Sequence, residues 1–169
     1  MVNISTKDRK LIEARKKMVI LQKRIPKSVR MLYPRRLDYK VYLFEDSRGV
    51  FAETKCQIFI PSKYYFSKDD ADYILKNQEK YQDKIAKIWD SIQKVDLTGT
   101  CLSHQELMQI TKLRPFCFMD IKEINFFCSP LSLDAFYFGE FGKNGWFEPS
   151  EKYTKPYGWC YALRKKESL

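Results

Sequence analysis

Apolar side chains near the start of the chain recur at intervals of three, four or seven residues. This spacing places them on one narrow face of a helix, so we expect an amphipathic helix over residues 5–25. Pro26 ends this helix, because a proline disfavours helical geometry in the residue before it. Residues 26–36 then form an irregular basic connector. The apolar positions are Ile4, Leu11, Ala14, Met18, Leu21 and Ile25.

A β-hairpin is expected directly after this connector. Residues 39–45 alternate in character and are rich in aromatic and β-branched types, which is typical of a strand. The sequence Asp-Ser-Arg-Gly at 46–49 predicts a turn. Residues 50–60 predict the returning strand, which ends at Pro61.

The middle of the chain has the periodicity of a long helix. Apolar residues recur down to Val95, and the hydroxyl of Ser67 is placed to cap the first turn. At 1.5 Å per residue this helix would span roughly 40 Å. Ser103 and Glu106 then have the spacing of a capping box, which predicts a short second helix that ends before Pro115.

The last third of the chain is rich in aromatic residues. Residues 116–161 contain 14 of the 26 aromatic side chains. Asn144 and Gly145 form a dipeptide that is typical of a two-residue hairpin turn. The expected strands are 116–119, 124–128, 135–141, 145–147 and 157–163.

These elements predict an α+β fold. We expect an antiparallel sheet with a central long helix, a short helix and a basic N-terminal helix. In domain terms, residues 1–36 form a basic helical arm and connector, and residues 37–169 form a single α+β globular domain. A chain of 169 residues is long enough to bury a hydrophobic core of this kind.

Charge is concentrated at one end of the chain. Residues 1–40 contain 13 Lys and Arg and three acids, whereas the other 129 residues contain 18 charges of each sign. A concentrated positive segment attracts polyanions, which include nucleic acid, an anionic membrane and an acidic protein. The apolar face of the predicted helix has no Trp or Phe, which disfavours insertion into a membrane.

The charge pattern therefore predicts a nucleic-acid-binding accessory or regulatory protein that contacts DNA or RNA phosphates through its N-terminal helix. Affinity of this kind is driven by the release of counterions. The expected phosphate contacts are Lys10, Arg15, Lys16, Lys17, Lys23, Arg24, Lys27, Arg30, Arg35 and Arg36.

Two other functions are open on the same pattern. One is a phage- or plasmid-type inhibitor that binds an acidic surface of a host protein. The other is a small Mg²⁺-dependent nuclease, because acids and a nearby lysine on paired strands can hold the metal and polarise a phosphate. The nuclease set is Glu45, Asp46, Glu53 and Lys55.

Two further groups of residues have a structural and a functional interpretation. One group consists of residue types that bind zinc, namely Cys101, His104, Cys117 and Cys128. Free cysteines in apolar runs are, however, usually buried. Exposed aromatics on a sheet face, among them Tyr157, Trp159 and Tyr161, can stack on unpaired bases, although most such residues belong to a core.

Composition excludes several classes. The hydrophobic content of 44% argues against a disordered chain, and no apolar run approaches the roughly 20 residues of a membrane span. There is no apolar segment typical of a secretory signal, and the five cysteines form no CxxC pair, so we expect a cytoplasmic protein with reduced thiols. No motif predicts a cofactor or dictates one chemistry.

Overall fold

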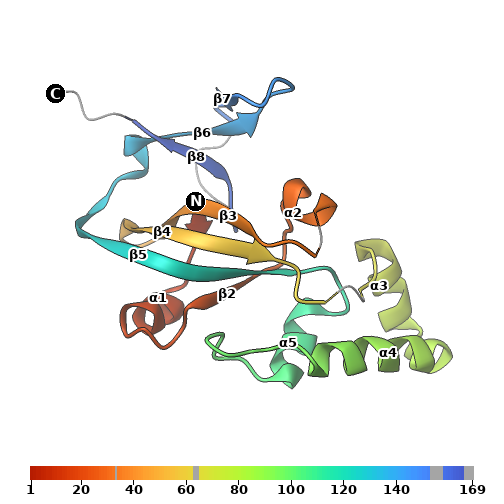
Figure 1. Cartoon of the computed structure of the whole chain (residues 1–169). Coiled ribbons are helices and arrows are strands. Elements are labelled where there is room, and N and C mark those ends of the chain that lie inside the picture. The colour runs from red at the N-terminus through yellow and green to blue at the C-terminus, as the bar shows by residue number, and fades with distance from the viewer. Residues whose placement is uncertain (33, 63–64, 153–157, 166–169) are drawn as a thin grey trace. The chain divides into compact units, whose positions relative to one another are not determined.

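The structure is a computed structural model, which describes residues 1–32, 34–62, 65–152 and 158–165 (Figure 1). No helix in these ranges combines the length and the apolar character that crossing a membrane requires. The helices and strands are β1 (Val2–Asn3), α1 (Thr6–Glu13), β2 (Val19–Gln22), α2 (Lys27–Met31), β3 (Leu37–Glu45), β4 (Gly49–Phe59), α3 (Lys68–Lys76), α4 (Gln82–Gln93), α5 (His104–Thr111), β5 (Cys117–Leu131), β6 (Phe136–Phe141), β7 (Phe147–Pro149) and β8 (Tyr161–Arg164), with 3-10 helices η1 (Gln78–Tyr81) and η2 (Leu133–Ala135).

The chain has a mixed α+β fold in which most strand pairs are antiparallel. A five-stranded sheet has the order β1-β3-β4-β5-β2, and a three-stranded sheet has the order β7-β6-β8. The pair β1–β3 is parallel, whereas β2–β5, β6–β7 and β6–β8 are antiparallel.

The residues group into two compact units, and the long strands β3, β4 and β5 contribute residues to both. Unit 1 contains residues 1–14, 39–56 and 122–169, and unit 2 contains residues 15–38 and 57–121. The division into an arm at 1–36 and a domain at 37–169 stays a prediction about which part folds independently.

Unit 1 buries a core between the β3–β4 hairpin and one face of the small sheet. Tyr42 of β3 meets Phe136 of β6 edge to face, with ring centroids 4.9 Å apart. Met1, Phe44, Val50 and Phe138 belong to the same buried set. This packing covers the part of one face of the β6–β7–β8 sheet that contains Phe136 and Phe138, whereas Glu140 on the same face is exposed.

Unit 2 buries its core where helices α3, α4 and α5 pack with the first residues of β5. Ile88 and Ile92 of α4, Leu107 of α5 and Phe118 of β5 belong to one buried cluster. Figure 1 shows the three helices gathered into one group. Strand β2 pairs with β5 beside this core, with Ile20 opposite Met119.

The helix predicted over residues 5–25 is wrong beyond its first two turns. Ser5 caps α1 by accepting a hydrogen bond from the Asp8 amide, but the helix ends at Glu13 and Arg15 adopts a positive φ of 57°. Residues 19–22 are strand β2. The run Met18 to Leu21 is apolar and includes two β-branched residues, and the non-local pairing with β5 outweighs its helical spacing.

The long helix predicted from Ser67 to Val95 is interrupted. Ser67 does cap α3, because its hydroxyl accepts from the Asp70 amide. The helix stops at Asn77, whose side-chain amide donates to the Tyr73 carbonyl at 2.9 Å. Asparagine competes with the backbone in this way, so η1 separates α3 from α4. The connector at 26–36 is likewise not wholly irregular, since it contains the short helix α2.

Several local predictions are confirmed. The predicted hairpin is β3 and β4, and the capping box of Ser103 and Glu106 begins α5. Asn144 and Gly145 lie in the turn between β6 and β7, where Gly145 has a φ of 77°, but the connection runs over residues 142–146 and is not a two-residue turn. The two strands predicted at 116–119 and 124–128 are one continuous strand, β5.

Candidate nucleic-acid interface

The positive charge of the chain is concentrated in residues 15–36, which we call the cationic segment. This segment has nine Lys and Arg and no Asp or Glu, and it therefore carries nine of the ten net positive charges of the chain. It belongs to unit 2. Its cations are Arg15, Lys16, Lys17, Lys23, Arg24, Lys27, Arg30, Arg35 and Arg36.

Apolar residues and backbone hydrogen bonds anchor this segment. The amides of Met18 and Val19 donate to the Gly99 carbonyl at 2.9 and 3.0 Å, and β2 pairs with β5 over four residues. Ile25 and Val29 are buried, at 6% and 0% exposure. Lys27 and Arg30 lie on the short helix α2, and the other cations lie in the loops beside β2 and after α2 rather than on one long helix.

Five of the cations are exposed and unpaired. Within the described part of the chain, the side chains of Lys16, Lys23, Lys27, Arg30 and Arg35 form no ion pair. Since no acid occurs in the segment, their charges are not neutralised by close sequence neighbours either. Such a surface has a positive potential that a phosphate backbone can neutralise.

Two members of the predicted set have a different environment. Lys17 is buried, with 8% of its surface exposed. Arg36 lies with its guanidinium carbon 3.9 Å from the ring centroid of Phe59 and forms a 3.5 Å ion pair with Asp120. Both side chains therefore have protein surroundings that the five unpaired cations lack.

Lys10, the one predicted contact that lies outside the cationic segment, is on α1 in unit 1 beside a buried ionic network. Arg9 pairs with Glu45 and also donates to Glu13 at 2.6 Å, and Thr6 donates to Glu45 at 2.5 Å. Burial alone would raise the pKa of Glu45, but the hydrogen bonds from Thr6 and Arg9 and the charge of Arg9 lower it below its usual value. The sequence pattern did not indicate that Arg9 forms a buried ion pair.

The nuclease set is not gathered into a metal site. Glu45 forms an ion pair with Arg9. Glu53 forms a 3.1 Å ion pair with Lys40, and Lys55 forms a 2.9 Å ion pair with Glu123. No group of three or more His, Cys, Asp or Glu residues able to hold a metal ion occurs in the described ranges. Glu45 and Glu53 of this set thus have structural partners.

The four residues of the zinc set are not brought together either. Cys117 is fully buried, and burial raises the pKa of its thiol to about 12. A ring nitrogen of His104 lies 2.8 Å from the Val95 carbonyl oxygen, and the Cys101 thiol donates to the Lys16 carbonyl at 3.3 Å. Cys128 is exposed on β5 in unit 1, whereas the other three belong to unit 2.

The aromatic residues of the last third divide between core and surface. Phe136 and Phe138 of β6 are buried in unit 1. Because side chains alternate along a strand, Tyr137 and Phe141 lie on the opposite face, where they are 46% and 55% exposed. Tyr157 lies outside the described residues.

The strand register defines this second face, which we call the outer face. Leu163 lies opposite Tyr137, Phe147 opposite Phe141, and Tyr161 opposite Gly139. Trp159 meets Tyr161 edge to face at 5.1 Å between centroids. The outer face thus comprises Tyr137, Phe141, Phe147, Trp159, Tyr161 and Leu163.

Cations and an exposed indole border the outer face. The ammonium of Lys165 lies 4.8 Å from the ring centroid of Tyr137. Trp146, in the turn between β6 and β7, is 74% exposed and follows Lys143 closely in sequence. The sequence predicts aromatic residues on this sheet. It does not indicate which of them remain exposed, because that depends on which face of the sheet packs on the core.

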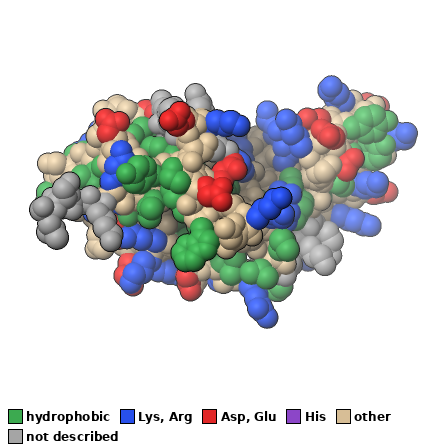
Figure 2. Space-filling model, turned by 90° about the horizontal axis from the view of Figure 1, so that it is seen from above, with side chains coloured by type: hydrophobic (Ala, Val, Ile, Leu, Met, Phe, Trp, Pro, Cys, Tyr) green, Lys and Arg blue, Asp and Glu red, His purple; other side chains and the backbone are tan. Residues whose placement is uncertain are grey.

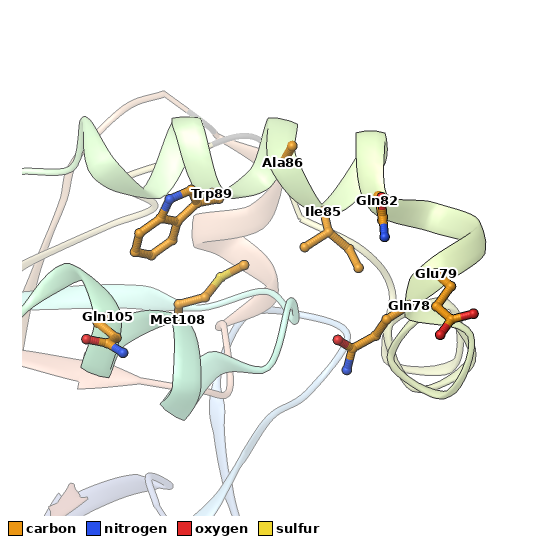
Figure 3. A pocket seen from close by; sticks show the side chains of 8 residues that line it. All are labelled: Gln78, Glu79, Gln82, Ile85, Ala86, Trp89, Gln105 and Met108. Carbon is orange, nitrogen blue, oxygen red and sulfur yellow. The ribbon is translucent and has the colours of Figure 1, made fainter.

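A separate groove of about 840 Å³ lies in unit 2 between α4, α5 and η1 (Figure 3). Figure 3 shows Trp89 and Ile85 of α4 and Met108 of α5 directed into it. The other lining residues include three glutamines and Glu79 but no Lys or Arg. The groove therefore lacks the positive charge that marks the cationic segment.

The face of the molecule drawn in Figure 2 shows Lys and Arg side chains in many places, with apolar patches and acids between them. No family model matches the chain, and neither the curated proteins nor the solved structures give a match. We therefore infer the function from the chain's own residues.

Proposed function

We propose that this chain is a nucleic-acid-binding accessory protein that contacts phosphates through its cationic segment. The observation that carries the proposal is the group of five exposed cations without an ion pair, on a segment that contains no acid. Neutralising phosphates with Lys and Arg releases condensed counterions, which supplies most of the free energy of sequence-independent binding.

The anchoring of the segment supports this function. Its backbone is held by β2 and by the hydrogen bonds to Gly99, so the cations do not have to be ordered from a disordered tail on binding. Phosphate contacts fix position but do not read sequence. The proposed binding through this segment is therefore independent of base sequence and extends to both DNA and RNA.

The test removes four of the unpaired cations together. We would replace Lys23, Lys27, Arg30 and Arg35 by Gln and measure fluorescence anisotropy with a labelled duplex over a salt series. A matched control replaces four other exposed lysines by Gln. These lie on or beside α3 and α4 and are Lys68, Lys76, Lys87 and Lys94. Each lost phosphate contact lowers the slope of log affinity against log salt by about 0.9.

The expected result is a weaker affinity and a shallower salt slope in the segment variant, with the control variant close to wild type. An equal loss in both variants would contradict the proposal, because it would show a response to net charge alone. Absence of binding by the wild-type chain at about 50 mM salt, where such contacts are strongest, would also overturn it.

An acidic protein partner is a second candidate, as in a phage- or plasmid-type inhibitor. The specific observation is that Met31 and Leu32, at 72% and 42% exposure, lie among the cations of the same segment. Exposed apolar residues with a charged rim are typical of a protein interface. In that case replacing Met31 and Leu32 by Ser would abolish a complex that persists at high salt, whereas nucleic-acid affinity would not change.

A further inference from the structure

We propose that the outer face of the β6–β7–β8 sheet binds the unpaired bases of single-stranded nucleic acid. In this arrangement Phe141 and Trp146 stack on bases, and Lys143 and Lys165 contact the adjoining phosphates. The inference rests on the proposed function, because it names the form of nucleic acid that the chain prefers and a second surface that takes part.

The first support is the exposure of aromatic rings on a sheet whose other face is partly buried. Phe141 and Trp146 are 55% and 74% exposed, whereas Phe136 and Phe138 are buried. Large aromatic side chains left uncovered in this way mark an interaction surface. Stacking on an aromatic ring is available to every base, but only when the base is not already stacked in a duplex.

The second support is the fixed orientation of the Phe141 ring. Phe141 meets Tyr161 edge to face with centroids 4.8 Å apart, and Phe147 on its other side at 6.3 Å. These contacts fix the orientation of Phe141 although it is exposed. A ring that is already ordered loses little entropy when a base stacks on it.

The third support is positive charge at the border of the outer face. Lys165 lies over the Tyr137 ring at 4.8 Å. Lys143 is exposed in the turn between β6 and β7, three residues before Trp146. Aromatic rings with neighbouring cations are the combination that single-strand-binding surfaces use.

The charges of Lys143 and Lys165 favour nucleic acid, rather than a second copy of the chain, as the ligand of the outer face. In a two-fold dimer the same surface patch is present on both sides of the interface. Pairing through the outer face would therefore bring Lys143 and Lys165 of each copy toward a surface with the same cations. A polyanion meets those cations with opposite charge.

The test compares single-stranded and duplex probes. We would replace Phe141 and Trp146 by Ala and measure anisotropy with a labelled oligothymidylate of about 16 nucleotides and with a duplex of equal length. Loss of stacking should weaken single-strand binding about tenfold or more, with an unchanged salt slope and an unchanged duplex affinity. The matched control is Tyr73→Ala, which removes a 54% exposed ring from α3 in unit 2.

The single variant Trp146→Phe keeps a smaller ring in the turn and guards against misfolding in the double variant. Tryptophan emission quenched by the oligothymidylate in wild type should be quenched less in Trp146→Phe. If wild type binds both probes and the double variant binds the single strand equally well, the inference is overturned while the proposed function stands. If wild type binds neither probe, the proposed function itself fails.

Sedimentation velocity adds an outcome for the alternative occupant. If wild type is a dimer that the double variant converts to a monomer while oligothymidylate affinity is unchanged, the outer face is a self-association surface and the inference is overturned. A wild-type chain whose oligomeric state does not respond to the double variant agrees with the inference.

Discussion

Phe141 and Tyr161 pair edge to face on the outer face of the small sheet, with ring centroids 4.8 Å apart and an interplanar angle of 81°. The pair belongs to neighbouring strands, since β6 pairs with β8. Neither ring belongs to the two buried clusters found among the described residues. Aromatic residues of the last third thus fall into two groups, one buried in the cores of the two units and one exposed.

Stability measurements should distinguish buried from exposed aromatic residues. Replacing Phe118 by Ala opens a cavity in the core of unit 2 and should lower the free energy of unfolding by about 3–5 kcal/mol. Replacing Trp146 by Ala should change it by no more than about 0.5 kcal/mol, because the side chain is 74% exposed. Urea unfolding followed by circular dichroism measures both, and a large loss in Trp146→Ala would show that this indole has a structural role.

The buried ion pair of Arg9 and Glu45 should stabilise unit 1 strongly. Arg9→Met leaves Glu45 without its cation at a side-chain exposure of 3%, which should cost about 3–5 kcal/mol. The control is Arg48→Met, because Arg48 pairs with Glu13 at 3.5 Å on the surface, and such pairs contribute about 0–1 kcal/mol. The double variant Arg9→Met with Glu45→Leu should recover most of the loss, and equal losses in Arg9→Met and Arg48→Met would contradict this account.

The same pair predicts an acid-sensitive stability. The folded structure lowers the pKa of Glu45 from its usual value of 4.5, so the ionised carboxylate is favoured in the folded state. The resulting stabilisation is fully present above about pH 4.5 and is lost as the pH falls through the lower, folded pKa. Glu45→Gln should flatten this part of the curve of unfolding free energy against pH, and an unchanged curve would show that other groups control it.

The cysteines should differ widely in reactivity. Burial raises the pKa of the Cys117 thiol to about 12, whereas Cys101 and Cys128 are exposed. Because the thiolate is the reactive form, iodoacetamide at about pH 8 should label Cys101 and Cys128 in the native chain and leave Cys117 unmodified until denaturant is added. Peptide mass spectrometry measures this order, and early labelling of Cys117 would contradict its burial.

The hairpin turn should not tolerate a side chain at Gly49. This residue has a φ of 101°, and a Cβ placed there would lie 2.5 Å from the Leu131 carbonyl oxygen. Gly49→Ala should therefore lower the unfolding free energy by about 1–3 kcal/mol. Gly145→Ala is an informative comparison, because Gly145 also has a positive φ but its Cβ would meet no atom within 4 Å, so its smaller loss should report backbone strain alone.

Local signals in the sequence were enough to predict the parts of the fold that depend on neighbouring residues. The turn at 46–49, the Ser67 cap and the capping box of Ser103 and Glu106 involve residues within four positions of one another. The α+β class follows from these elements, and it is confirmed.

Non-local pairing explains what the sequence did not reveal. Residues 19–22 have a spacing that suits a helix, but their partners in β5 lie about a hundred positions away along the chain. The same holds for the candidate sites, since the partner of Glu45 is Arg9 and that of Lys55 is Glu123. The exposed aromatics could be named only once the register of β6 with β7 and β8 fixed the two faces of that sheet.

Nucleic-acid binding by the cationic segment and the outer face is best tested by locating bound nucleic acid on the chain. Photo-cross-linking to a thiouridine-containing single strand, followed by peptide mass spectrometry, identifies the residues that touch it. We expect cross-links at Phe141 or Trp146 and at residues 23–36, with competition by unlabelled single strand. Cross-links confined to helices α3–α5, or none at low salt, would contradict it.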